Sequence, residues 1–250
     1  MADAAGATTE QKVMPLELFF DLVLVFAITQ VTGFISAHPT WPRLVEGLAI
    51  LAALWWAWVS YAWLSNSAAS DEGAARVVLL AAMGALLITS LAVPDTFGKN
   101  ALAFGIAYLG VRLLHLGAYL VVARGNAQLH RVVLRLAVTV VPAASLLVVA
   151  GIVDGVPRDI CWVLALVVDY GGLAVRGVQG WRVEPSHFAE RHGGIIIIAL
   201  GESIVALGVG VEGLALGPEV ILSALLGITI AGAMWWAYFD VAAIVAERRF

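Results

Sequence analysis

The sequence predicts an all-α fold, a bundle of about eight membrane-spanning helices, from its composition and from the lengths of its apolar runs. Of its 250 residues, 62% are hydrophobic and 13% are charged, and the mean hydropathy is +0.95. Soluble domains carry about 25% charged residues. The composition therefore excludes an ordinary water-soluble enzyme, a disordered chain and a nucleic-acid-binding protein.

Apolar runs close to the bilayer-crossing length of about 20 residues recur along the chain. They lack the alternation of transmembrane β-strands, so each is expected to be a helix, and residues 1–250 are expected to form one transmembrane domain. The runs cover residues 16–37, 44–64, 76–93, 101–123, 131–150, 159–178, 193–211 and 219–246. Turn-forming residues end the first seven in order: His38-Pro39, Ser65-Asn66-Ser67, Pro94-Asp95, Gly125-Asn126, Asp154-Gly155, Glu184-Pro185 and Gly217-Pro218.

Lysine and arginine residues are distributed unevenly between the two sides of such a bundle. Because basic residues concentrate in cytoplasmic loops, both termini are expected to face the cytoplasm. Glu17 and Asp21 open the first span, which argues against a cleavable signal peptide. The expected cytoplasmic side holds ten basic residues, Lys12, Arg76, Arg124, Arg131, Arg135, Arg176, Arg182, Arg191, Arg248 and Arg249, and the other side holds three, Arg43, Lys99 and Arg158.

Three charged residues fall near the middle of expected spans: Arg112, Asp169 and Glu202. Each costs about 2.5–3.5 kcal/mol at the centre of a bilayer, so none is expected to face lipid. We expect them to meet inside the bundle, where Arg112 neutralises one carboxylate. The other carboxylate would be protonated, hydrated or paired with a cation.

The fourth expected span carries a polar stripe. Tyr108, Arg112, His115 and Tyr119 follow one another at spacings of four, three and four residues, which places them on one helix face. Gly105 extends the stripe and would allow a neighbouring helix to approach closely. The stripe is expected to face protein or water.

Two interpretations of these buried groups remain open. In one, the ion pair is structural and fixes the helix register. In the other, the polar site binds a solute or relays a proton, with Glu202 and Asp169 as carriers, Arg112 as counter-charge and His115 as a polar neighbour.

A second polar cluster is expected at the cytoplasmic end. Helix capping explains Glu17 and Glu190 well, because acids favour a helix N-terminus. Asp21 lies deeper, and we expect it to pair with Arg191 or His192 and to form a cytoplasmic gate with them. The whole cluster is Glu17, Asp21, Glu190, Arg191, His192 and Asp240.

Several long motifs resemble the bacterial low temperature requirement A (LtrA) family, in the order in which that family has them. They are PLELFFDLVLVFAITQVT at 15–32, WWAWVSYAWLSN at 55–66, VRLLHLGAYL at 111–120, HFAERHGGIIIIALGESIVALG at 187–208 and WWAYFD at 235–240. The resemblance implies a multi-pass protein of the bacterial inner membrane. The family name describes a growth phenotype and not a chemistry.

The resemblance also implies which positions matter, although none is a demonstrated catalytic residue. Asp169 lies outside the matching motifs. Family members continue past the last motif, so the chain is expected to be a short form or a fragment. The matching polar positions are Glu17, Asp21, Gln30, Arg112, His115, Glu190, Arg191, His192, Glu202, Ser203 and Asp240.

A parallel internal repeat is a further expectation, with residues 15–180 as the first unit and 185–250 as the start of a second. In each, a proline and a glutamate open a span, and an aromatic motif follows in the next span: Trp55-Trp56-Ala57-Trp58 and Trp235-Trp236-Ala237-Tyr238. Repeats of this kind are common in transporters. The site would then be incomplete or completed by another copy, as in a homo-oligomer.

The sequence favours a protein that moves a small solute, ion or proton over the alternative of a sensory or scaffolding membrane protein. It contains neither an H-E-x-x-H nor a G-x-S-x-G motif, which disfavours an intramembrane enzyme. With one cysteine and one deep histidine, no metal or cofactor is expected. The expected partners are the lipid bilayer and a second copy, and not nucleic acid.

Overall fold

The computed structural model describes residues 15–67, 73–176 and 185–242, and within these residues every regular element is helical. The all-α fold predicted from the sequence is confirmed. The eight α-helices are α1 Pro15–Ala37, α2 Trp41–Ser67, α3 Gly73–Ala92, α4 Ala101–Val122, α5 Ala127–Ala150, α6 Val156–Arg176, α7 Pro185–Gly210 and α8 Pro218–Trp236. A short 3₁₀ helix, η1 Val93–Asp95, follows α3, and a π-helical turn, η2 Ala237–Ala242, follows α8.

Local chemistry sets several helix ends. Between α4 and α5, Gly125 takes a φ of +80°, a left-handed conformation that suits glycine. The side chain of Asn126 then accepts hydrogen bonds from the backbone N–H groups of Gln128 and Leu129, at 3.1 and 3.0 Å, and caps α5. Before α6, Gly155 likewise takes a left-handed conformation, with a φ of +62°.

Seven of these helices are long and apolar enough to cross a membrane, counting only the described residues. The remaining one, α6, is 21 residues long, which also suffices for a bilayer. It carries Arg158 and Asp159 at its start, Asp169 within it and Arg176 at its end. These charges interrupt its apolar stretch, although Asp169 is neutralised inside the bundle, as shown below.

The chain divides into two compact units, which are described separately. Unit 1 comprises residues 1–18 and 184–250, and unit 2 comprises residues 19–183. The division falls close to the boundary expected for the internal repeat. The repeat itself remains a prediction, because compactness does not show that the two parts share an ancestor.

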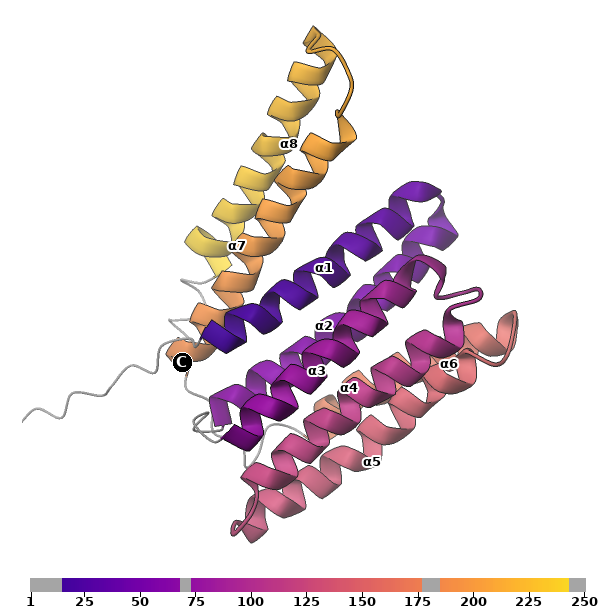
Figure 1. Cartoon of the computed structure of the whole chain (residues 1–250), viewed down its shortest axis with the longest axis vertical. Coiled ribbons are helices and arrows are strands. Elements are labelled where there is room, and N and C mark those ends of the chain that lie inside the picture. The colour runs from indigo at the N-terminus through magenta and orange to yellow at the C-terminus, as the bar shows by residue number, and fades with distance from the viewer. Residues whose placement is uncertain (1–14, 68–72, 177–184, 243–250) are drawn as a thin grey trace, which may run out of the picture. The chain divides into compact units, whose positions relative to one another are not determined.

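Unit 2 contains most of α1 and all of α2 to α6. Neighbouring helices in the sequence pack side by side from α3 to α6, and α2 packs on both α4 and α6 (Figure 1). The closest approach joins α4 to α5. A Cβ atom at Gly105 would lie 2.5 Å from the backbone oxygen of Leu147, and one at Gly151 would lie 2.5 Å from the Cα atom of Leu102. The close approach predicted at Gly105 is thus present, and it brings α4 deep into the unit.

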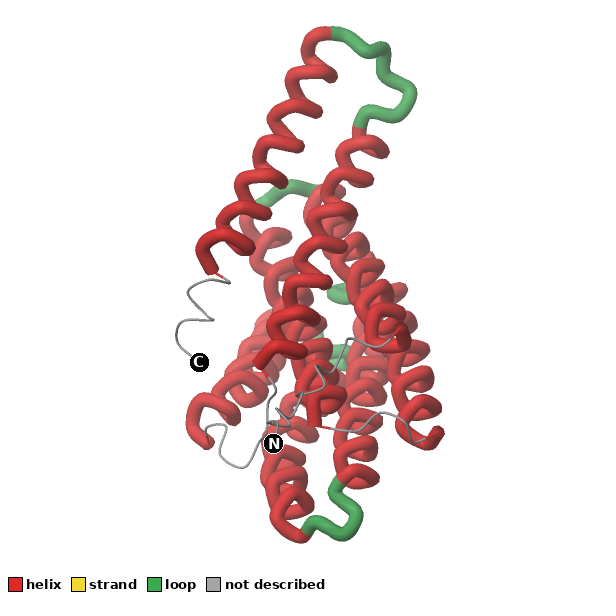
Figure 2. The backbone as a smooth tube through the Cα atoms, turned by 90° about the vertical axis from the view of Figure 1, so that its left-hand side faces the viewer, coloured by secondary structure: helices red, strands yellow, loops and turns green. Residues whose placement is uncertain are grey.

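Unit 1 contains the first turn of α1, α7, α8 and η2. The helices α7 and α8 form an antiparallel hairpin joined by the loop 211–217 (Figure 2). They meet where Gly227 faces the side chain of Leu207. Only 6% of the apolar window of each of these two helices is buried, against 50% for α2 and α4.

Candidate functional site

The polar stripe predicted on α4 faces the interior of unit 2. Tyr108, Arg112, His115 and Tyr119 are 2%, 1%, 2% and 1% exposed. The i, i+3 and i, i+4 spacing that identified the stripe is the spacing that points all four side chains toward one side of a helix. The stripe therefore contacts protein and not lipid, and it supplies one wall of a polar site.

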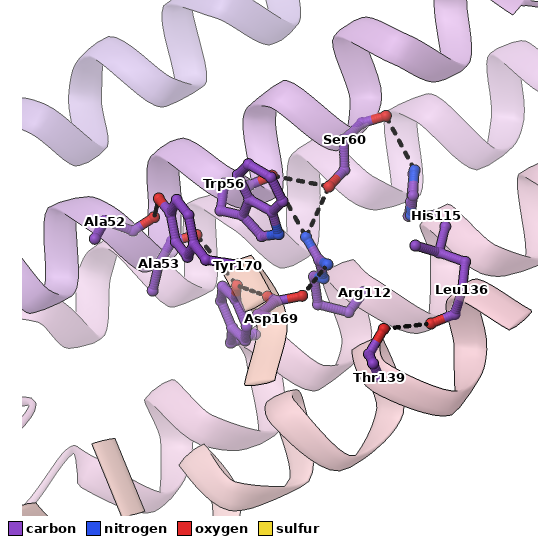
Figure 3. A network of polar contacts seen from close by, with 11 residues as sticks. Ala52, Ala53, Trp56, Ser60, Arg112, His115, Leu136, Thr139, Asp169 and Tyr170 are labelled. Carbon is purple, nitrogen blue, oxygen red and sulfur yellow. Dashed lines mark hydrogen bonds and ion pairs between the residues drawn. The ribbon is translucent and has the colours of Figure 1, made fainter. Parts of the chain in front are cut away.

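Arg112 is the centre of that site and links three helices (Figure 3). Its Nη2 donates to Oδ1 of Asp169 on α6 at 2.8 Å, in an ion pair between two buried side chains. Its Nη1 donates to Oγ of Ser60 on α2 at 2.8 Å, and more weakly to the carbonyl oxygen of Trp56 at 3.4 Å. Its Nε has no hydrogen-bond partner among the described residues.

The second oxygen of the Asp169 carboxylate lies near a tyrosine hydroxyl. Tyr108 donates its hydroxyl hydrogen to the carbonyl oxygen of Ala53 at 3.1 Å, and the same hydroxyl oxygen lies 3.5 Å from Oδ2 of Asp169. The next residue on α6, Tyr170, stacks on Trp56 with ring centroids 4.3 Å apart. These contacts hold α6 against α2 and α4 around the charge pair.

His115 joins the same network through Ser60. Its Nε2 lies 3.0 Å from the backbone oxygen of Ser60. A carbonyl oxygen only accepts, so Nε2 must carry the hydrogen, and in a neutral ring Nδ1 then carries the lone pair. Nδ1 is buried and has no hydrogen-bond partner among the described residues. Ser60 therefore connects Arg112, through its hydroxyl, with His115, through its carbonyl.

The cluster expected at the helix ends is divided between the two units. In unit 1, Nη1 of Arg191 lies 3.7 Å from Oε1 of Glu17, and both side chains are buried. In unit 2, Asp21 accepts a 2.6 Å hydrogen bond from the indole Nε1 of Trp58. Glu17 is thus more than a capping residue. The pairing of Asp21 with Arg191 or His192, and their role as a gate, remain predictions.

Most of the other expected site residues lie in unit 1. Glu202 is half-buried on α7 in unit 1. The hydroxyl of Ser203 donates a hydrogen bond to the carbonyl oxygen of Ala199 at 3.1 Å. Nδ1 of His192 lies 2.8 Å from the carbonyl oxygen of Phe188, one turn earlier on the same helix. The remaining members are half-buried or exposed: Gln30 is half-buried on α1, and Glu190 and Asp240 are exposed.

Sequence reasoning located the charges of the site and its partners on α4, but not its uncharged partners on α2 and α6. Three uncharged partners were missed: Ser60 accepts from Arg112, Tyr170 stacks on Trp56, and the Trp58 indole donates to Asp21. None of them lowers the hydropathy of its span enough to mark a polar site. The available signal was spacing, because Trp56 and Ser60 are four residues apart and so share a face of α2. A polar face on α2 would have predicted a partner for the stripe on α4.

The arrangement can stabilise opposite charges away from water and can change its bonding when one of them is protonated. In the described part of the chain, no group of three or more His, Cys, Asp or Glu side chains converges in a way that would hold a metal ion. The groups that make up the Arg112 site are a guanidinium, a carboxylate, hydroxyl groups and an imidazole.

Comparison with known proteins assigns the chain to a family. Residues 12–249 match the family of the bacterial low temperature requirement A protein (LtrA). The chain belongs to the LtrA family. It is also 28% identical over 248 residues to an uncharacterized protein of Rhizobium meliloti (strain 1021). The match covers 93% of this chain and 59% of that relative, so this LtrA chain is the shorter of the two.

No solved structure matches this LtrA chain. Its family is bacterial, and its helices imply a multi-pass protein that lies in a lipid bilayer. The resemblance identified from the motifs is confirmed, whereas the family assignment brings no activity with it.

Proposed function

We propose that this LtrA protein transports a small solute, ion or proton through the polar site of unit 2. The observation that supports the proposal is the buried Arg112–Asp169 pair, formed near the middle of membrane-length helices. Ionisable groups are costly at that depth and usually mark a pathway. The transport site would lie in a bacterial inner membrane, with both termini in the cytoplasm.

The pair supplies a coupling step. Protonation of Asp169 removes the negative charge that balances Arg112, so the guanidinium needs another anion or an altered set of hydrogen bonds. The bonds of Arg112 to Ser60 and Asp169 reach two different helices, α2 and α6. A change in the charge of Asp169 therefore alters the force that holds these helices on α4, which is what an alternating-access mechanism requires.

The second candidate is a scaffolding or sensory membrane protein in which the charge pair is structural. It is favoured by how completely Asp169 is bonded: Arg112 binds one carboxylate oxygen and Tyr108 approaches the other. Buried pairs of this kind can fix a unique helix register without taking part in function. Under this alternative, the pair would lock α2, α4 and α6 together.

A flux assay separates the two candidates. The chain is reconstituted in proteoliposomes, and proton movement and the uptake of a panel of solutes are measured under an imposed pH gradient. The test variant is Asp169→Asn, which keeps the shape of the side chain and removes its titration. The matched control is Asp95→Asn, because Asp95 forms only an exposed pair with Lys99 at 3.9 Å.

Transport predicts that the unsubstituted chain and Asp95→Asn support flux and that folded Asp169→Asn does not. The scaffolding candidate predicts no flux from any of the three proteins above that of empty vesicles. It also predicts that Asp169→Asn lowers thermal stability while Asp95→Asn leaves it unchanged.

A further inference from the structure

We infer that Arg112 binds a small monocarboxylate, which pairs with the guanidinium when Asp169 is protonated. The inference names a substrate class for the proposed transport site and rests on that proposal for the ligand's movement. Its binding step can be tested without any flux.

The first argument is the geometry of the guanidinium. Nε–H and the adjacent Nη2–H groups form one edge of its plane, and this edge matches the two oxygens of a carboxylate. In unit 2, Asp169 takes only the Nη2 half of the edge, at 2.8 Å. The Nε half has no hydrogen-bond partner among the described residues, although Arg112 is 1% exposed. A ligand carboxylate would satisfy both halves.

The second argument is that hydrogen bonds to Nη1, on the opposite side of the guanidinium, hold this edge in place. Nη1 of Arg112 is fixed by Ser60 at 2.8 Å and by the carbonyl oxygen of Trp56 at 3.4 Å. The hydroxyl of Ser60 in turn donates to that same carbonyl at 2.8 Å. Because these bonds do not involve Asp169, they can persist when its charge is lost. The guanidinium is therefore oriented before a ligand arrives, which favours binding.

The third argument identifies the ligand class. The side chain of Asp169 is itself a CH₂–COO⁻ unit, so the site already solvates one acetate-like group. Arg112 is its donor, and the Tyr108 hydroxyl lies 3.5 Å from its other oxygen. A ligand of the same kind would be planar, small and singly charged. A cation would repel Arg112, and a dianion would leave one charge unbalanced away from water.

Charge balance links ligand and proton. Asp169 takes up one proton and becomes neutral, and the ligand brings one negative charge, so the net charge of the site is unchanged. Among the described residues, the other titratable groups near Asp169 are Arg112 and Tyr108 on α4 and Tyr170 on α6. From the other helices that pack around it, α2 contributes Trp56 and Ser60, and α5 contributes Thr139 against Gly172. Asp169 is thus the acidic group that would take the proton.

The test measures the thermal unfolding of the full chain in detergent with sodium acetate or sodium chloride at equal ionic strength. For the unsubstituted chain, acetate should raise the unfolding temperature at acidic pH and lose this effect at neutral pH. Asp169→Asn mimics the protonated acid, so acetate should stabilise it at both pH values. Arg112→Lys keeps the positive charge but loses the paired Nε–H and Nη2–H donors. This variant should bind acetate about tenfold more weakly.

Two outcomes overturn the inference: acetate fails to stabilise both the unsubstituted chain at acidic pH and Asp169→Asn, or chloride stabilises them equally. If Arg112→Lys does not fold, Ser60→Ala replaces it and should weaken acetate binding by loosening the guanidinium. Flux without acetate binding would leave transport standing and remove the carboxylate as ligand. Acetate binding without flux of any solute would keep the carboxylate as a ligand of Arg112 and overturn the proposed transport.

Discussion

Among the described residues, each unit contains an ion pair between buried side chains, and the two pairs differ in the distance between their charged atoms. In unit 2, Nη2 of Arg112 and Oδ1 of Asp169 lie 2.8 Å apart, and Nη1 of Arg112 also donates to Ser60 on α2. In unit 1, Nη1 of Arg191 and Oε1 of Glu17 lie 3.7 Å apart, beyond hydrogen-bond distance, and both residues take part in further interactions. The first pair is thus a direct hydrogen-bonded contact that links α4, α6 and α2, whereas the second is a longer contact between charges.

The largest effect should come from breaking the pair in unit 2. Asp169→Ala leaves Arg112 buried without its counter-charge and should cost about 3–5 kcal/mol of unfolding free energy. The double variant Arg112→Met/Asp169→Leu should recover most of this loss, because it removes both charges together. Denaturant unfolding in mixed micelles measures both values.

The pair in unit 1 provides the comparison. Glu17→Gln should cost less than Asp169→Ala, because the ion contact is long, the amide keeps the size of the side chain, and Arg191 takes part in further interactions. Equal losses for the two substitutions would show that the two pairs are energetically alike.

The next effect concerns the two carboxylates of α1, which lie one turn apart. Asp21 belongs to unit 2 and accepts a 2.6 Å hydrogen bond from the Trp58 indole. Trp58→Phe keeps an aromatic ring but removes this donor, and should cost about 1.5–3 kcal/mol, as for hydrogen bonds to charged groups. Trp55→Phe is the matched control, because Trp55 is only half-buried. A loss of the same size in the control would indicate that ring volume, and not the hydrogen bond, is responsible.

Glycine substitutions sharpen the comparison between the units through their packing. Gly105→Ala in unit 2 would drive a methyl group into the backbone of α5 and should cost about 1–3 kcal/mol. Gly227→Ala in unit 1 meets only the end of the Leu207 side chain, which can change rotamer, so its cost should be smaller. Gly110→Ala, with no atom within 4 Å of the new Cβ, is the neutral control on α4. Thermal unfolding of the three variants should follow that order, and an unaffected Gly105→Ala would contradict the close α4–α5 contact.

The sequence predicted the fold because apolar runs of bilayer length leave few alternatives to helices. The centres of the expected helices agree with the structure, but their ends do not always. The run expected from 193 begins at Pro185 in α7, since a helix continues through polar residues such as Arg191 that hydropathy does not recognise. In the run expected from 219 to 246, α8 ends at Trp236 and the π-helical turn η2 follows to Ala242, and residues 243–246 lie outside the described residues.

The site was predictable only in part, for a related physical reason. A charge near mid-membrane is conspicuous, so Arg112 and Asp169 could be identified, and a pairing of Arg112 with either Asp169 or Glu202 was predicted. No sequence pattern specified which carboxylate it would be, because that depends on tertiary packing. The hydrogen bond from Arg112 to Ser60 and the contact of Tyr108 also depend on how α2 rotates against α4, which hydropathy leaves undetermined.

The smallest effect on stability should come from Glu202, the second carboxylate expected in the site. It is half-buried on α7, and neighbours such as Gly201 and Ser203 are exposed. Glu202→Gln keeps the length and shape of the side chain, and it should change the unfolding free energy by less than about 0.5 kcal/mol.

Function should respond differently from stability at this position. If Glu202 is a second proton carrier, Glu202→Gln slows the flux through proteoliposomes while acetate binding at Arg112 keeps its pH dependence, because protonation of Asp169 is what we propose controls that binding. Unchanged flux would remove Glu202 from the pathway and leave Asp169 as the carrier. A marked loss of stability would instead make Glu202 a structural residue of unit 1. The expected difference in stability loss between substitutions in unit 2 and in unit 1 would then no longer hold.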